Sequence, residues 1–247
     1  MMENPESHFI KRAGVYDCSS QWVKDPVLID KIKRLSDAGP DDYVLDLAVG
    51  TGKIAEAFRG QVRCVVGVDT CWQMAMQAMG RADRIVLARA ERLPFKDGMF
   101  DICVCRQGLQ FMDLDQALLA IHRVLKPGGR VVLCHLTSHG TKDREESFLV
   151  QQLRNPARKN FFLPQDFERI LKLNNFSDIE FFEYLTVESV NQWTDHGAID
   201  ENVRRRIREV YRNASDDFKN IHQLRFADGD IFDTMKMVIV KAVKKGD

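Results

Sequence analysis

The sequence predicts an α/β fold with a seven-stranded, mostly parallel sheet, an antiparallel hairpin at one edge and a helical cap. Three observations lead to this prediction. Short apolar runs alternate with helical patterns between residues 43 and 136, a glycine loop follows the first run, and two further strand-like runs stand far apart near the end of the chain. Such alternation is typical of βαβ units, whose parallel strands are buried on both faces.

The parallel part of the sheet is expected to contain five strands, at residues 43–47, 62–68, 84–88, 100–105 and 130–136. Before the last of them, Leu118, Ile121 and Leu125 recur at helical spacing, and Lys-Pro-Gly-Gly at 126–129 ends that helix. Residues 20–37 also carry a helical pattern. We expect this earlier segment to pack on the edge of the sheet or over its ligand.

The pattern changes after residue 137. A helix is expected at 165–174, a strand at 179–187 and its antiparallel partner at 234–243. We interpret residues 1–247 as one domain with three parts: an N-terminal helical lid at 1–40, a ligand-binding core at 41–137, and a cap formed by 138–163 together with 188–230. A length of 247 residues suits one sizeable core with such additions.

Composition excludes several classes of function. The 36 basic and 36 acidic residues give a formal net charge of zero, which offers no long-range attraction to nucleic acid. No stretch approaches the roughly 18 apolar residues that a membrane span needs, and residues 1–12 lack the apolar region of a secretory signal, so we expect a cytoplasmic protein. The six cysteines form no C-x-x-C pair, which favours reduced, mostly buried thiols and no metal site.

The glycine loop is the first candidate binding feature. Residues 44–53 read VLDLAVGTGK, so a strand runs directly into a loop where Gly50 and Gly52 allow close backbone approach. The N–H groups of the following helix favour an anionic or polar ligand group. Asp69, at the end of the second strand, suits a ribose. Gly50-x-Gly52-x-x-Ala55 also fits the dinucleotide fingerprint, and a loop without any ligand is a further alternative.

Asp46 distinguishes between these alternatives. It lies inside the first strand, where a dinucleotide site has an apolar residue, and a buried carboxylate requires a cationic or hydrogen-bonding partner such as an ammonium group. Together with four further motifs it resembles the class I S-adenosylmethionine-dependent methyltransferases, particularly the branch of the ubiquinone and menaquinone C-methyltransferases. The motifs are DLAVGTG at 46–52, VVGVD at 65–69, RAERLPF at 89–95, Phe100-Asp101, and VLKPGG at 124–129.

This resemblance implies a Rossmann-like sheet, S-adenosylmethionine as the cofactor and S-adenosylhomocysteine as its product. It also implies thirteen cofactor-binding residues: Tyr16, Asp46, Ala48, Gly50, Thr51, Gly52, Asp69, Thr70, Met74, Ala90, Glu91, Arg106 and Gln107.

The same resemblance implies how these residues divide the work. Asp46 holds the methionine amino end, directly or through water, and Gly50 and Gly52 admit the carboxypropyl chain. Asp69 accepts hydrogen bonds from the ribose, while Thr70, Met74 and the Ala90-Glu91 segment contact the adenine. Arg106 and Gln107 lie near the transferring methyl group, and the segment with Tyr16 folds over the cofactor.

Two positions depart from the family pattern. Ala48 stands where the first loop glycine is most common, a change that the quinone enzymes also show. Arg89 stands where relatives often have an acidic or amide side chain for the adenine amino group, and a guanidinium has no acceptor for that proton. The adenine contact is then expected from the backbone, with Arg89 facing solvent.

Methyl transfer is a displacement for which alignment and exclusion of water can suffice, so a base is needed only for a protonated acceptor. His135 ends the fifth strand and is the candidate base, with His139, His196 and His222 as other choices. Its alternative is a strand-end histidine that hydrogen-bonds a loop. Likewise, Phe148, Phe161, Phe162 and Trp193 line either an apolar acceptor pocket or the cap's own core, and the arginine run at 204–208 is either an anion site or a solvated helix face.

The sequence therefore predicts methyl transfer to a small, partly apolar molecule, with the O, C, N or S acceptor atom left open. A nicotinamide-dependent oxidoreductase and a non-catalytic S-adenosylmethionine-binding protein are the alternatives. Asp46 and the motifs at 93–95 and 124–129 disfavour the oxidoreductase.

Overall fold

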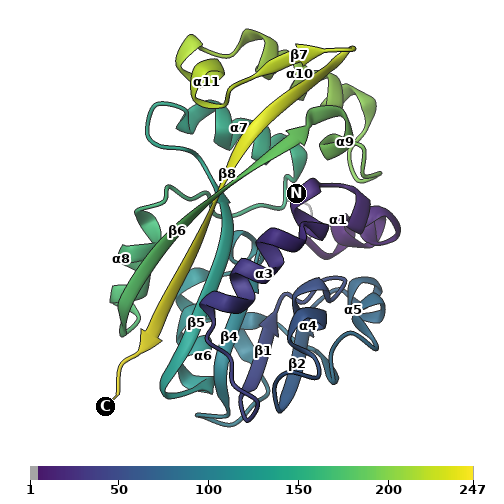
Figure 1. The fold of residues 1–247 in the computed structure, drawn as a ribbon. Helices are drawn as coiled ribbons and strands as arrows, with labels where there is room; N and C mark the ends of the chain where they lie inside the picture. Colours follow the sequence, from purple (N-terminus) through teal and green to yellow (C-terminus); the bar gives the residue numbers. More distant parts are fainter. Residues whose placement is uncertain (1–4, 247) are drawn as a thin grey trace.

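The computed structural model describes residues 5–246, and its centre is one mixed sheet of eight strands (Figure 1). The strands run in the order β3-β2-β1-β4-β5-β8-β6, with β7 paired to β8. The first five are parallel, and β6, β7 and β8 pair antiparallel. Their bounds are β1 (Tyr43–Leu47), β2 (Cys64–Asp69), β3 (Arg84–Leu87), β4 (Phe100–Arg106), β5 (Leu125–Thr137), β6 (Phe176–Ser189), β7 (Arg225–Ala227) and β8 (Asp230–Lys244).

The predicted fold class is confirmed, with one strand more than the predicted seven. The additional strand, β7, has three exposed residues and therefore shows no alternation of buried and exposed side chains in the sequence. Three strands are also longer than predicted, since β5, β6 and β8 span 13, 14 and 15 residues. From β1 the sheet extends through β2 and β3 to one side and through β4 and β5 to the other, so the strand order reverses between β1 and β4. Open α/β sheets bind ligands at this position.

The N-terminal segment contains four short helices, α1 (Pro5–Arg12), the 3₁₀ helix η1 (Ala13–Cys18), α2 (Gln21–Lys24) and α3 (Pro26–Leu35). The single helix predicted at 20–37 is thus two helices. Asp25 causes the break, because its side chain accepts hydrogen bonds from the N–H groups of Val27 and Leu28 and so caps α3, whose first residue is a proline. We call α1, η1 and α2 the lid.

The other helices lie between and beyond the strands. Those of the core are α4 (Lys53–Phe58), α5 (Trp72–Ala78), η2 (Ala90–Arg92), η3 (Leu109–Phe111), α6 (Leu114–Val124) and α8 (Asp166–Leu173). Four more, α7 (Arg144–Arg154), α9 (Val190–Thr194), α10 (Glu201–Asn213) and α11 (Asp216–Ile221), form the helical cap at the far end of the sheet (Figure 1).

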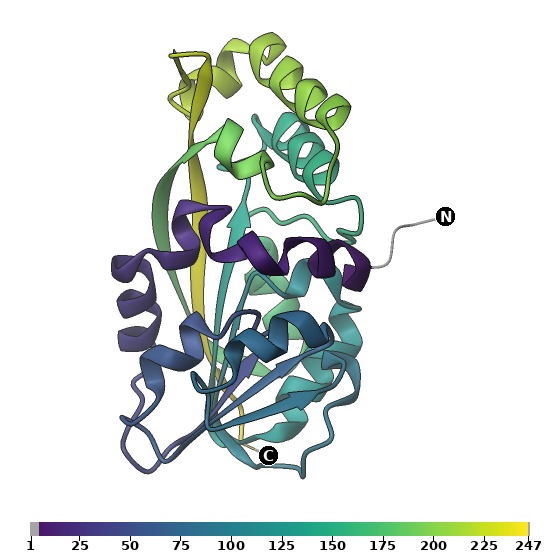
Figure 2. The ribbon, with the colours of Figure 1, turned by 90° about the vertical axis from the view of Figure 1, so that its right-hand side faces the viewer.

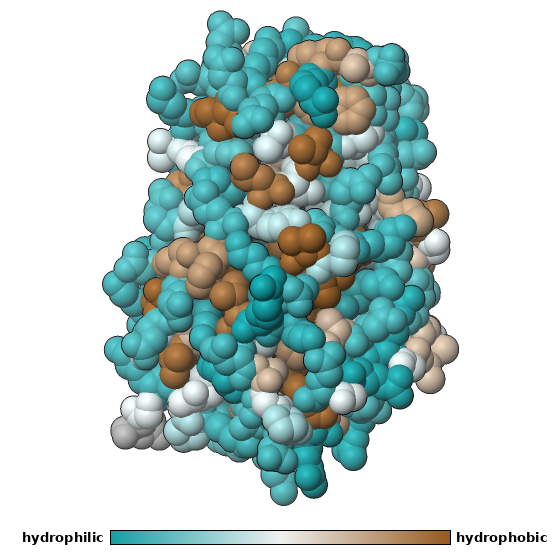
Figure 3. Space-filling model, in the orientation of Figure 1, coloured by the Kyte–Doolittle hydropathy of each residue, from teal (hydrophilic) through white to brown (hydrophobic). Residues whose placement is uncertain are grey.

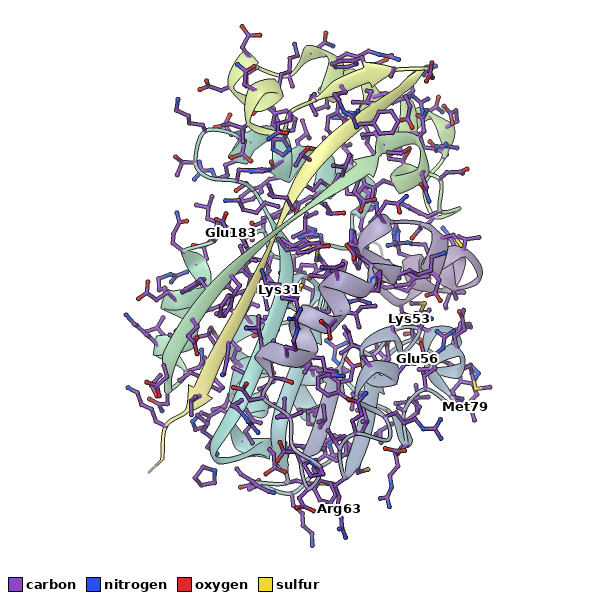
Figure 4. The ribbon with its side chains drawn as sticks, in the orientation of Figure 1. Lys31, Lys53, Glu56, Arg63, Met79 and Glu183 are labelled. Atoms are coloured by element: carbon purple, nitrogen blue, oxygen red, sulfur yellow. The ribbon has the colours of Figure 1, made fainter. Side chains whose placement is uncertain are left out.

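Both faces of the sheet are buried, as the apolar runs of its strands require. Val44 and Val132 pack with α3 and α4 on one face, and their neighbours Leu45 and Leu133 pack with α6 and α8 on the other. Each such side chain stabilises the fold by about 1.5–3 kcal/mol through burial. Figure 4 shows Lys31 of α3 beside Glu183 of β6, where its ammonium donates to the Glu183 carbonyl at 3.0 Å.

The lid crosses the molecule between the core and the cap (Figure 2). Two contacts hold it in this position. The Thr51 hydroxyl donates to Asp17 Oδ1 at 2.6 Å, which joins η1 to the glycine loop. On the other side, the buried carboxylate of Glu188 accepts hydrogen bonds from the N–H groups of Gln21 and Trp22. The lid therefore contacts both parts of the molecule.

The cap is joined to β8 by a buried charged cluster centred on His222. Its Nδ1 lies 2.7 Å from Asp233 Oδ1 and its Nε2 lies 3.0 Å from Asp143 Oδ2. Burial opposes a charged imidazole, but the hydrogen bonds to Asp143 and Asp233 raise the pKa of His222 to about 9. Tyr211 of α10 donates to the other oxygen of Asp233 at 2.7 Å. His222 is thus enclosed in a structural ion-pair network.

The face of the molecule in Figure 3 is mostly hydrophilic, with apolar side chains in small separate groups. None of the helices within residues 5–246 has the length and apolar character needed to span a membrane.

Candidate active site

A cavity of about 200 Å³ opens at the carboxyl ends of β1, β2 and β4, beneath the lid. Its walls include ten of the thirteen residues that the sequence assigned to cofactor binding: Tyr16, Ala48, Gly50, Asp69, Thr70, Met74, Ala90, Glu91, Arg106 and Gln107. Asp46, Thr51 and Gly52 do not line the cavity. The structure therefore brings three of the five motifs together with the end of β4 at one site.

Asp69 is positioned by the loop that it faces. Its Oδ2 accepts a hydrogen bond from Gly50 N and its Oδ1 accepts one from Cys71 N, both at 2.9 Å. Burial raises the pKa of Asp69, and these N–H groups oppose that shift. The carboxylate thus stands at the cavity wall with its orientation fixed by backbone groups.

The glycine loop has a left-handed backbone at Ala48, Gly50 and Gly52, with φ values of 58°, 55° and 84°. Ala48 accepts this conformation despite its Cβ, and Gly108 provides the space, because a Cβ at Gly108 would lie 2.7 Å from the Ala48 Cβ. A Cβ at Gly52 would lie 2.9 Å from Ala78 Cβ. Gly52 is therefore required for packing between α4 and α5 rather than as part of the cavity wall.

Asp46 is almost fully buried on the face of the sheet that carries α4. Its Oδ2 accepts a hydrogen bond from Ala55 N at 2.9 Å. Burial raises the pKa of Asp46 to about 7, and the nearby positive charge of Arg106 opposes that shift. Any contact between this carboxylate and a ligand in the cavity has to pass through or around the loop.

Arg106 and Gln107 form the floor of the cavity at the end of β4. Arg106 Nη1 donates to the carbonyls of Trp22 and Val23 at 3.1 and 3.3 Å, so this arginine holds the lid down. Gln107 has a left-handed backbone with φ of 57°, and its Oε1 accepts a hydrogen bond from Gln110 Nε2 at 2.9 Å. Its own Nε2 is buried without a hydrogen-bond partner among residues 5–246.

The adenine-side wall is formed by η2. Glu91 Oε1 accepts hydrogen bonds from Asp113 N at 3.0 Å and from Arg89 Nη2 at 3.3 Å. The Arg89 side chain is 64% exposed at the rim of the cavity, in agreement with the expectation that it faces solvent. Since protein donors occupy Glu91 Oε1, the Ala90-Glu91 backbone remains the expected contact here.

The structure does not place His135, the candidate base, at the cavity. Its side chain does not line the cavity; it is fully buried and stacks on Phe167 with ring centroids 5.6 Å apart. Nδ1 lies 3.1 Å from Gln110 Oε1, and burial lowers the pKa of His135 to about 3. This geometry matches the alternative of a strand-end histidine that hydrogen-bonds a loop.

The remaining candidates have mostly structural positions. Phe162 is buried in the core, Phe148 packs against Phe161, and His196 is fully buried. Within the arginine run, Arg204 and Arg208 pair with Glu201. These pairs favour a solvated helix face over an anion site. No group of three or more His, Cys, Asp or Glu side chains within residues 5–246 is arranged to hold a metal ion.

Sequence reasoning missed the cavity residues outside the motifs, namely Glu6, Phe9, Gly108, Phe111, Met112 and Lys159. The signal for Phe9 is weak, because α1 is a short helix with a single aromatic residue. In the structure its ring contacts Phe111 edge-on, with centroids 5.1 Å apart, and this contact closes the lid over the cavity.

The sheet order and the cavity at its switch point define an α/β enzyme that binds a nucleoside cofactor. Comparison with known proteins makes this class specific. A family model described as "Methyltransferase domain" matches residues 45–133. A demethylmenaquinone methyltransferase of Mycobacterium marinum is 32% identical over 171 residues, which cover 68% of this chain and 67% of the relative.

Two further proteins extend the comparison. The uncharacterized protein MJ1123 of Methanocaldococcus jannaschii is 30% identical over 182 residues, covering 70% of this chain and 82% of the relative. The crystal structure of the YcgJ protein from Bacillus subtilis superposes with a TM-score of 0.81 at 22% identity, covering 89% of this chain and 98% of that one. The chain belongs to the class I S-adenosylmethionine-dependent methyltransferases. S-adenosylmethionine is its cofactor, and the predicted resemblance to the menaquinone branch is confirmed; the oxidoreductase alternative is not supported.

Proposed function

We propose that this enzyme transfers the methyl group of S-adenosylmethionine to a small, partly apolar acceptor that enters beneath the lid. The observation that carries the proposal is the lining of the cavity, which combines the carboxylate of Asp69 with the side chains of Gln107 and Phe111. The lid covers it, so the acceptor has to be small enough to fit between the lid and the end of β4. A net charge of zero adds no attraction for nucleic acid.

In this proposal the cofactor is held along the strand ends. Asp69 accepts hydrogen bonds from the ribose, and the loop at Ala48 and Gly50 lies along the carboxypropyl chain. Thr70, Met74 and the Ala90-Glu91 backbone surround the adenine. The uncompensated buried donor of Gln107, together with a cavity lined by both carboxylate and apolar groups, fits this mixed ligand.

In this proposal, methyl transfer relies on the alignment of the acceptor with the cofactor more than on acid–base chemistry. S-adenosylmethionine supplies an activated methyl group on a sulfonium, and Arg106, Gln107 and Tyr16 enclose the space in which an acceptor meets it. None of the histidines 8, 122, 135, 139, 196 and 222 lines this cavity. We infer that alignment and exclusion of water provide most of the rate enhancement. The name of the M. marinum relative gives demethylmenaquinone as the acceptor of that protein, whereas the acceptor proposed for this chain is a smaller molecule.

Calorimetric titration with S-adenosylhomocysteine tests the site. Asp69→Ala should weaken binding roughly a hundredfold or more, because two hydrogen bonds from the ribose to a charged carboxylate are lost. Asp41→Ala, which removes an exposed carboxylate outside the cavity, is the matched control and should bind as the wild type does. Equal affinities of wild type and Asp69→Ala would refute the assignment of Asp69.

A further inference from the structure

A second, smaller chamber adjoins the cofactor cavity on the side of the cap. The two share the side chains of Phe9, Tyr16, Gln107 and Phe111. The chamber is otherwise walled by residues of the lid, η3, β5, α7, the turn after α7 and α9. Its volume of about 30 Å³ is room for two or three water-sized atoms. A small terminal group fits there, but a ring does not.

Three arginines, Arg12, Arg154 and Arg158, line this chamber. Arg12 is 2% exposed and Arg154 is 8% exposed. No Asp or Glu of residues 5–246 lies within 4.0 Å of any of the three guanidinium groups. Burial is the main cause that lowers the pKa of Arg12 to about 10 and that of Arg158 to about 9, which reflects the cost of enclosing these charges.

The protein compensates these charges only in part. Arg154 lies 4.4 Å from the centre of the Trp193 ring and donates to the Trp193 carbonyl at 2.8 Å. Arg12 lies 5.1 Å from the Tyr16 ring and donates to Ser19 at 3.2 Å. Glu188 acts on Arg154 electrostatically, but its carboxylate is occupied by N–H groups of the lid. Aromatic faces and neutral acceptors offset less of a buried charge than a carboxylate does.

Hydrogen-bond donors are also in excess around the chamber. Arg12 Nε, Arg158 Nε and Trp22 Nε1 are buried without a partner among residues 5–246, and these groups are donors in any orientation. The amides of Gln107 and Asn155 add two more nitrogen atoms without a partner, whereas Gln151 Oε1 is the one oxygen in this state on the chamber wall. Unsatisfied buried donors are costly unless a ligand supplies acceptors.

We propose that this chamber binds an oxyanion carried by the methyl acceptor, so that the substrate is a small molecule with a carboxylate or phosphate at one end and an apolar part toward the cofactor. This inference rests on the proposed function and specifies its substrate class. A buried anion between the three arginines would accept hydrogen bonds from the free donors of Arg12 and Arg158 and offset the charge of Arg154. It would also offset the repulsion between the arginines and the sulfonium of the cofactor, which a neutral acceptor leaves unopposed.

Calorimetry on protein loaded with S-adenosylhomocysteine tests this, using benzoate, phenyl phosphate and the neutral benzamide as probes. At least one anion should bind roughly tenfold tighter than benzamide or more, because hydrogen bonds to charged groups are lost with the neutral probe. Comparison of benzoate with phenyl phosphate identifies which oxyanion the chamber prefers. Equal affinities of anions and benzamide, or no detectable binding of either anion, would overturn the proposal.

Arg158→Met is the most informative variant. The only hydrogen bond of this guanidinium to the protein that is seen among residues 5–246 runs from Nη1 to the Asn160 carbonyl at 3.4 Å, and methionine retains an apolar stem of similar length. The preference for the anion should fall several-fold or more, and Arg158→Lys should restore part of it. Arg205→Met removes a 65% exposed arginine on α10 and is the matched control for net charge.

The same samples separate this inference from the proposed function. If wild-type protein does not bind S-adenosylhomocysteine, the proposed function fails, while anion binding can still be measured on the unloaded protein. If Arg158→Met and Arg12→Met weaken S-adenosylhomocysteine as strongly as they weaken the anions, the chamber holds the carboxylate of the cofactor, and the proposal for the acceptor is refuted. Intact S-adenosylhomocysteine binding with a reduced anion preference supports it.

Discussion

The cofactor cavity and the adjoining chamber differ in how the protein treats buried charge. Asp69 at the cavity wall accepts hydrogen bonds from two backbone N–H groups, and Asp46, just outside the cavity, is stabilised by Ala55 N and the charge of Arg106. In the chamber, three arginines stand without a carboxylate partner among residues 5–246. The first site is prepared for a ligand that the whole family shares, whereas the second is incomplete until a particular ligand arrives.

Among the variants that should affect the chamber but not the cofactor cavity, Trp193→Ala is expected to have the largest effect. This ring is 2% exposed and supports the Arg154 guanidinium, so its removal should lower the free energy of unfolding by about 3–5 kcal/mol. The anion preference of the chamber should decrease, while the affinity for S-adenosylhomocysteine measured by calorimetry stays nearly unchanged. Trp72→Ala, at a ring that is 54% exposed, should change stability by less than about 0.5 kcal/mol. Equal losses of anion and cofactor binding would show that the two regions are not independent.

A pH titration of stability probes the attachment of the cap. Because the pKa of His222 is raised from 6.5 to about 9, its contribution to stability is fully present below pH 6.5 and is lost as the pH rises through 9. The loss should be roughly 3 kcal/mol at most. The melting temperature of the wild type should therefore fall over this pH range. His222→Gln should have a lower melting temperature that depends less on pH. His139→Gln should keep the alkaline decline, since the pKa of His139 is lowered by burial.

Gly108→Ala tests the close contact beneath the glycine loop. The new Cβ would lie 2.7 Å from both Ala48 Cβ and Cys105 Sγ, an overpacking expected to cost about 1–3 kcal/mol and to weaken S-adenosylhomocysteine binding by displacing the loop. Adding Ala48→Gly should recover part of both losses. Gly140→Ala is the control, because a Cβ there meets no atom within 4 Å. No recovery in the double variant would argue that the clash is with Cys105 instead.

The smallest expected effect is on catalysis by His135→Asn. Because this buried ring stacks on Phe167 and does not line the cavity, kcat should change only a few-fold and the acid limb of the pH–rate profile should not move. The assay measures formation of S-adenosylhomocysteine once an acceptor is found. A loss of about a hundredfold in kcat with unchanged cofactor affinity would assign His135 a catalytic role after all.

The cofactor-binding part of the molecule could be predicted because its strands and binding residues are encoded by short, contiguous sequence motifs. Asp46, Gly50 and Asp69 stand at strand ends that apolar runs define, and the strands were expected within a few residues of their observed bounds. His135 shows where this reasoning stops. A position at the end of a strand does not reveal the face to which it points, and β5 directs Cys134 and Leu136 to one face and His135 to the other.

The chamber could not be predicted for a different reason. Arg12, Gln107 and Arg158 come from segments separated by about fifty residues or more, and only the tertiary fold brings them together. The sequence offered a more conspicuous arginine cluster at 204–208, which includes pairs with acidic neighbours on the surface of α10. Burial without a partner, rather than density along the chain, marks the arginines of interest.

The long strands limit which parts of this enzyme can move during turnover. β6 and β8 pair from Phe176↔Lys244 to Ser189↔Phe232, a length of roughly 45 Å at about 3.3 Å per residue, and they pass from the core into the cap (Figure 1). The one shift in their register lies between Ser177 and Glu180, and the pairing from Glu180 to Ser189 is continuous. A hinge between core and cap would have to break this ladder. Ligand entry and product release therefore fall to the lid, whose short helices are held by hydrogen bonds that include those donated by Arg106 and Thr51 and those accepted by Glu188. The residence time of both ligands is then governed by the same small segment of the chain.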